Sequence, residues 1–127
     1  MSLDFEIGFE KKPEGIELVF EKQEFVYVPM PKSSKRKHDY NIYKKKEEPI
    51  ILFYYPDFKQ NSRDSPDWRA NGYNICSLLH IKSQKDSEDF GSISKTDAEM
   101  FGRLIVDAFN GIFYDYRLDQ FFKKGKV

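Results

Sequence analysis

The feature of this sequence that most constrains its fold is the apolar run Ile50–Tyr55. Successive residues of a strand point to opposite faces of a sheet, so a strand that is apolar at every position suits a place where both faces are covered. We therefore expect residues 50–55 to form a central strand.

Four other segments have the pattern of strands. Residues 3–9 are apolar at every second position, with the acidic Asp4 and Glu6 between them, which is typical of a strand with one buried face. A Pro- and Gly-containing turn at 11–15 separates them from apolar segments at Ile16–Phe20 and Phe25–Val28, and we expect these three strands to form an antiparallel meander. Residues 73–81 alternate again, which predicts a fifth strand.

One amphipathic helix is predicted near the C-terminus. Ser94 or Thr96 supplies N-cap chemistry, and Asn110-Gly111 is a usual left-handed end. Gly102 lies inside this helix, where it costs about 1 kcal/mol relative to alanine, so we expect another element, most simply a strand, to approach closely there. The apolar residues recur every three or four positions: Met100, Phe101, Leu104, Ile105, Ala108, Phe109 and Ile112.

These elements predict an α+β fold, in which an antiparallel sheet of about five strands carries one C-terminal amphipathic helix on one face as a two-layer sandwich. The chain has 127 residues, of which 39% are hydrophobic and 17% aromatic, and this is enough for a single domain over 1–127 with a core. An exposed basic loop is expected at about 32–48. The segment 112–122 fits a short strand, a last helical turn or both.

The cellular setting is predicted from what the sequence lacks. A single cysteine, Cys76, allows no internal disulfide and suits a reducing compartment. The first ten residues have no pattern of a signal peptide, and the longest apolar run is far shorter than the roughly 20 residues that span a bilayer. We expect a cytoplasmic protein, or one inside a virion, with no membrane partner.

Residues 32–46 form the most unusual segment of the sequence. They contain seven Lys and Arg residues against Asp39 alone, a balance of +6, so the rest of this chain of zero net charge carries −6. Cations neutralise phosphates and tyrosine rings stack on single-stranded bases, which predicts a nucleic-acid site. The predicted contacts are Lys35, Arg36, Lys37, Lys44, Lys45 and Lys46 with phosphates, and Tyr40 and Tyr43 with bases. The same segment also suits docking on an acidic protein surface, or lysines that keep a sheet edge from pairing.

Catalytic patterns are weak. Cys76 and His80 would lie roughly 13 Å apart along a strand, which is too far for a nucleophile and its base. The seven glycines are scattered singly and form no phosphate-binding loop, and two histidines with one cysteine do not make a transition-metal site. We therefore expect no cofactor.

The sequence favours a small non-enzymatic binding protein with nucleic acid or an acidic protein surface as its partner. One alternative is an inhibitor or immunity-type protein that blocks another protein through acidic loops. Its candidate residues are Asp57, Asp64 and Asp67, and Asp86, Glu88 and Asp89. A weaker alternative is a metal-dependent nuclease that uses Asp57, Asp64 and Asp67.

Overall fold

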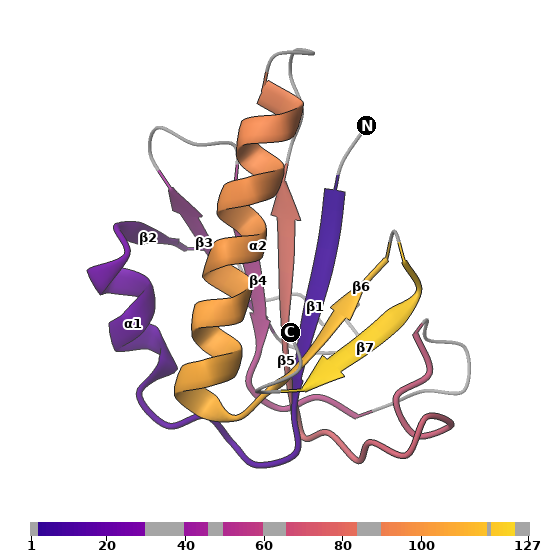
Figure 1. Ribbon diagram of the computed structural model, residues 1–127. Coiled ribbons are helices and arrows are strands. Elements are labelled where there is room, and N and C mark those ends of the chain that lie inside the picture. Colours follow the sequence, from indigo (N-terminus) through magenta and orange to yellow (C-terminus); the bar gives the residue numbers. More distant parts are fainter. Residues whose placement is uncertain are drawn as a thin grey trace.

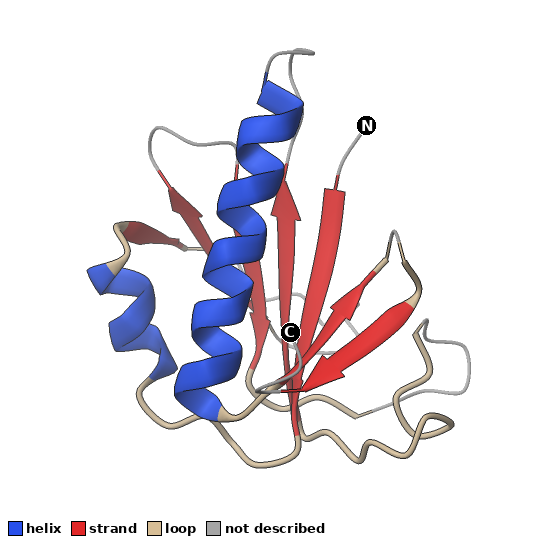
Figure 2. Cartoon of the chain, in the orientation of Figure 1, coloured by secondary structure: helices blue, strands red, loops and turns tan. Residues whose placement is uncertain are grey.

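The computed structural model describes residues 3–29, 40–45, 50–59, 66–83, 90–116 and 118–123. Within these residues, seven strands form one sheet, and every neighbouring pair is antiparallel. Two helices lie on the same side of this sheet (Figures 1 and 2). The predicted α+β class with an antiparallel sheet is confirmed, whereas the predicted counts of about five strands and one helix are wrong.

The elements follow one another as β1 (Leu3–Phe9), α1 (Ile16–Lys22), β2 (Phe25–Val28), β3 (Asn41–Lys45), β4 (Ile50–Tyr55), β5 (Ser77–Ser83), α2 (Phe90–Phe109), β6 (Ile112–Asp115) and β7 (Gln120–Lys123). Their order across the sheet is β2-β3-β4-β5-β1-β6-β7. The N-terminal strand therefore lies inside the sheet, between β5 and β6.

The predicted N-terminal meander is wrong. Strand β1 forms as expected, but Ile16–Lys22 is the helix α1, and β2 lies at the edge of the sheet beside β3. Gly15 is the N-cap residue before α1 and has a φ of 80°, a conformation that glycine adopts without strain. Ile16 and Phe20, one helical turn apart, are buried, while Leu18 between them is 63% exposed.

The predicted exposed loop at 32–48 is also corrected in part. Residues 41–45 form β3, which pairs with β2 on one side and β4 on the other. Residues 30–39 and 46–49 lie outside the described residues. The prediction of a central strand at Ile50–Tyr55 is confirmed, because β4 has β3 and β5 as neighbours.

Helix α2 begins at Phe90, before either predicted N-cap residue, and ends where the sequence predicted, with Asn110 in the left-handed conformation at a φ of 55°. Of the apolar residues that recur along this helix, Phe101 and Ile105 are buried, whereas Met100 is 65% exposed and does not belong to the core. The close approach at Gly102 is confirmed: a β-carbon there would lie 2.4 Å from Cε2 of Phe113 in β6.

Side chains of the two helices and of the sheet form one apolar cluster. The ring of Phe20 in α1 lies 4.9 Å from Tyr43 of β3 and 6.1 Å from Phe101 of α2, measured between centroids. Alternate residues of the central strands complete the cluster: Phe5, Ile7 and Phe9 of β1, Leu52 and Tyr54 of β4, and Leu79 and Ile81 of β5.

A second cluster covers one end of the opposite side of the sheet. It is centred on Trp68, which is 1% exposed and belongs to the connection between β4 and β5. This connection runs along the lower end of the sheet in Figure 1. Trp68 packs against Tyr114 of β6 and Phe121 of β7 and so holds the long connection against the sheet.

No helix in the described part of the chain combines the length and the apolarity that crossing a bilayer requires.

Candidate functional site

The side of the sheet opposite the helices, called the far face below, carries two regular rows of side chains in β3, β4 and β5. Strand register sets these rows. Ile51 of β4 lies between Lys44 of β3 and Lys82 of β5. In the next row, two residues further along β4, Phe53 lies between Ile42 and His80. Two residues of a strand span roughly 7 Å, so an aromatic row lies close beside a row in which a lysine lies on each side of Ile51.

Five rings form a continuous cluster at this place, the far-face cluster of Tyr40, Phe53, Tyr55, His80 and Tyr116. Tyr40 contacts both rings from β4, at centroid distances of 5.9 Å to Phe53 and 5.2 Å to Tyr55. His80 lies 5.9 Å from Phe53 and stacks on Tyr116 at 6.3 Å with an interplanar angle of 27°. The rings are half-buried or, for Tyr116, 36% exposed, so parts of them face outward.

A carboxylate lies beside the rings. Glu6 of β1 is adjacent to His80 in the sheet, is 7% exposed, and accepts a hydrogen bond from the hydroxyl of Tyr116. Burial raises the pKa of Tyr55, with smaller contributions from Tyr40 and the charge of Glu6. The far face therefore combines aromatic surface, a hydrogen-bonded carboxylate and two lysines.

The structure divides the residues predicted to bind nucleic acid into three groups. Tyr40 belongs to the far-face cluster, and Lys44 is exposed on the same face. Tyr43 is 5% exposed and packs under α1, so its ring is not available to stack on a base, because strand alternation turns it to the helix side. Lys45 also lies on the helix side, with Nζ 5.6 Å from the ring centroid of Phe25. Lys35, Arg36, Lys37 and Lys46 lie outside the described residues.

Four residues of the far-face cluster, and Lys82 beside it, were not predicted from the sequence. The strands that carry Phe53, Tyr55 and His80 were recognised, but the run Ile50–Tyr55 is apolar on both sides and does not show which side faces the helices. Pairing register decides which residues become neighbours, and register depends on contacts between strands distant in sequence.

The acidic residues considered for a metal or a protein partner are separate from this cluster. Asp57 is 90% exposed and its Oδ1 lies 3.6 Å from Nζ of Lys12. Asp67 accepts a hydrogen bond of 3.1 Å from the backbone N–H of Ala70 and so stabilises a turn. Asp64, Asp86, Glu88 and Asp89 lie outside the described residues. Among the described side chains, His, Cys, Asp and Glu form no group of three that would hold a metal ion.

The two residues considered as a nucleophile and its base have different surroundings. Cys76 is exposed and precedes β5, and its backbone N–H donates a hydrogen bond of 2.8 Å to the carbonyl of Phe9. His80 lies within β5 and contacts rings on the far face.

Comparisons of this chain with protein-family models, with curated proteins and with solved structures found no match.

Proposed function

We propose that this protein is a non-enzymatic binding protein and that it binds single-stranded nucleic acid on the far face of its sheet. Rings of the far-face cluster stack on bases, and Lys44 and Lys82 contact phosphates. The observation that carries the proposal is the pair of adjacent rows, one with Phe53 and His80 and one with the two lysines.

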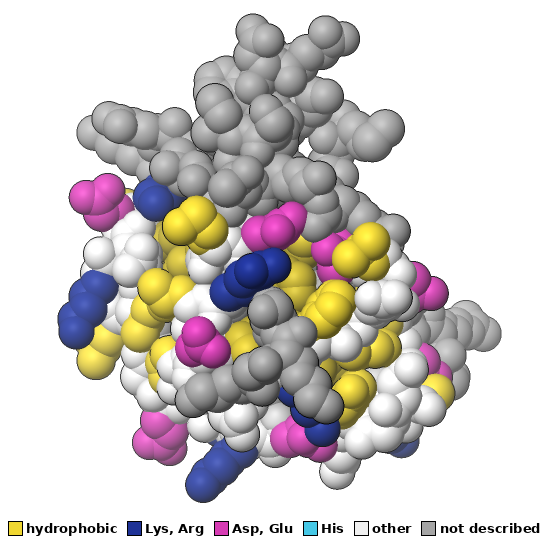
Figure 3. Space-filling model, in the orientation of Figure 1, with side chains coloured by type: hydrophobic (Ala, Val, Ile, Leu, Met, Phe, Trp, Pro, Cys, Tyr) yellow, Lys and Arg dark blue, Asp and Glu magenta, His cyan; other side chains and the backbone are white. Residues whose placement is uncertain are grey.

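Stacking supplies the larger part of the binding free energy in this proposal. A base stacked on an aromatic side chain contributes about 1–3 kcal/mol, whatever the identity of the base. The chain carries 21 basic and 21 acidic residues, so its overall charge does not attract a polyanion. Charged side chains of both signs are also interspersed on the helix side (Figure 3). Binding through stacking rings with a few lysines beside them therefore fits this protein better than binding through a general electrostatic attraction.

Glu6 restricts how a strand of nucleic acid lies on this face. A carboxylate repels phosphates but accepts hydrogen bonds from the amino groups of bases. Bases therefore lie over the aromatic row beside Glu6, and phosphates lie along the row that contains Lys44 and Lys82. Lys35, Arg36 and Lys37, which precede Tyr40 in the sequence, stay in the proposal as further phosphate contacts.

Fluorescence anisotropy with labelled single-stranded DNA and RNA oligonucleotides tests the stacking role. Phe53→Ala and Tyr40→Ala should each weaken binding about tenfold, because each removes one stacking ring. Tyr27→Ala is the matched control, since Tyr27 is 50% exposed but belongs to the helix side of edge strand β2. Equal losses in Tyr27→Ala and Phe53→Ala, or no binding by the wild type, would refute the proposal.

The salt dependence of the same titration tests the lysines. Each phosphate contact contributes about 0.7 to the slope of log K against log salt for a single strand, so Lys44→Gln and Lys82→Gln together should lower this slope by about 1.4. Lys22→Gln, which removes an exposed charge from α1, should leave it unchanged. A wild-type affinity that does not respond to salt contradicts the assigned role of both lysines.

A further inference from the structure

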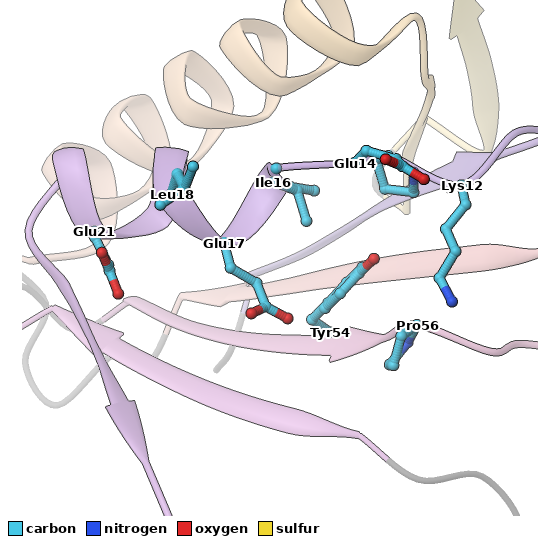
Figure 4. A pocket seen from close by; sticks show the side chains of 10 residues that line it. Lys12, Glu14, Ile16, Glu17, Leu18, Glu21, Tyr54 and Pro56 are labelled. Carbon is cyan, nitrogen blue, oxygen red and sulfur yellow. The ribbon is translucent and has the colours of Figure 1, made fainter.

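A second surface lies between α1 and the end of β4, on the helix side of the sheet. A groove of about 490 Å³, called the α1 groove below, opens there (Figure 4). It is lined by residues of the turn before α1, of α1 itself and of the end of β4: Lys12, Pro13, Glu14, Gly15, Ile16, Glu17, Leu18, Glu21, Tyr54 and Pro56.

The α1 groove has apolar parts and an anionic rim. Ile16 and Tyr54 are 2% and 3% exposed and form its buried wall, while Leu18 is 63% exposed at its edge. Glu17 and Glu21, one helical turn apart, extend from α1 toward the strand that carries Tyr54 (Figure 4). Apolar surface and carboxylates are therefore within reach of one ligand.

The charges of the groove favour a cation. Three glutamates and one cationic side chain, Lys12, line the groove. Nζ of Lys12 lies 3.6 Å from Oδ1 of Asp57, a residue that does not line the groove. Burial raises the pKa of Tyr54 to about 12, and the charge of Glu17 adds to this effect. The same two causes, in the same order, raise the pKa of Tyr43 to about 12. The carboxylate of Glu17 thus adds negative potential at the inner wall of the groove.

The arrangement of these carboxylates argues against a bound metal ion. Within the described residues, no three acidic or metal-ligating side chains converge closely enough to hold a metal. Lysine and arginine side chains instead place an apolar stem on an apolar surface and reach a carboxylate with the charged end. We propose that the α1 groove binds a lysine or arginine side chain presented by a segment of a partner protein.

The stability of the free protein provides a control for this proposal. Glu17 and Glu21 are four residues apart on one helix face, where like charges destabilise a helix, and Glu21 lies in the last turn, near the negative end of the helix dipole. Replacing Glu21 with glutamine should therefore raise the melting temperature slightly or leave it unchanged. A loss of binding in this variant does not then arise from unfolding.

Anisotropy of a short fluorescein-labelled peptide that alternates leucine and arginine tests the proposal on the full chain. The matched peptide carries citrulline, which keeps the shape of arginine without its charge. Wild-type protein should prefer the arginine peptide, and the Glu17→Gln and Glu21→Gln variants should each bind it about fivefold more weakly, as expected for one exposed ion pair. Amide resonances of residues 15–21 and 54 should shift during a nitrogen-15 NMR titration.

Asp107→Asn removes the same charge from an exposed position of α2 and serves as the control. An equal loss in this variant would show general charge attraction and overturn the proposal, as would equal affinity for the arginine and citrulline peptides. Oligonucleotide affinity should not fall in the two glutamate variants, so the outcome is separate from that of the nucleic-acid proposal.

Discussion

At the scale of single residues, close packing explains why a position holds a residue type that helix propensity alone would disfavour. Gly102 lies within α2, where alanine would favour the helix by about 1 kcal/mol. The sequence indicated a close neighbour at this position, but only the structure identifies it as the ring of Phe113. Helix propensity and packing therefore act in opposite directions at this residue.

We expect Gly102→Ala to destabilise the protein by about 1–3 kcal/mol, because its β-carbon would meet the Phe113 ring at 2.4 Å. Urea unfolding measures this change, and Phe113→Leu in the same background should recover part of the loss by removing the ring. Arg103→Ala, at the exposed neighbouring position, should change the free energy of unfolding by no more than about 0.5 kcal/mol. A stabilised Gly102→Ala protein would mean that helix propensity dominates here.

At the scale of elements, α1 shows why a short amphipathic segment is ambiguous. Ile16, Leu18 and Phe20 alternate with polar residues or valine, which resembles a strand. In a strand the three side chains would share one face, whereas a helix turns Leu18 about 200° away from Ile16. Burial of Ile16 and Phe20 with exposure of Leu18 follows the helical period.

This difference predicts opposite results for two substitutions in α1. Leu18→Ala should change the free energy of unfolding by about 0.5 kcal/mol or less, because Leu18 is 63% exposed. Phe20→Ala should cost about 3–5 kcal/mol, since it removes a fully buried ring that contacts Tyr43, Tyr54 and Phe101. Chemical denaturation compares the two variants, and similar losses in both would contradict the helical arrangement.

At the scale of the whole molecule, buried tyrosines make the free energy of unfolding depend on pH in the alkaline range. They belong to the apolar cluster that the two helices form with the sheet. Burial raises the pKa of Tyr43 and Tyr54 from 10.0 to about 12, with a smaller contribution from Glu17 in both. Between these values the unfolded chain has lost protons that the folded protein keeps, so stability falls as pH rises. The stabilisation is complete below about pH 10 and is lost as the pH approaches about 12.

The free energy of unfolding should therefore decrease between about pH 10 and about pH 12, and Tyr54→Phe should make this decrease smaller. Urea unfolding at intervals across this range measures the slope for both proteins. Below about pH 9 the two proteins should respond to pH alike, which serves as the internal control. An equal alkaline slope in both would exclude Tyr54 as a source of the effect.

The sequence by itself determined the parts of this protein that depend on local pattern. Alternation predicted β1, continuous apolarity predicted β4, and three- to four-residue spacing with Asn110 predicted most of α2 and its end. Two of the residues expected to contact nucleic acid, Tyr40 and Lys44, lie on the far face, and their role stays a prediction.

Only the tertiary structure decided which side chains meet. The position of β1 between β5 and β6 brings Glu6 beside His80, although the two residues are far apart in the sequence. Strand alternation turns Tyr43 into the shared apolar cluster and Lys44 to the opposite face, and pairing register places Phe53 beside His80. Register and strand order arise from the burial of the whole apolar surface at once, so no local segment of the sequence contains them.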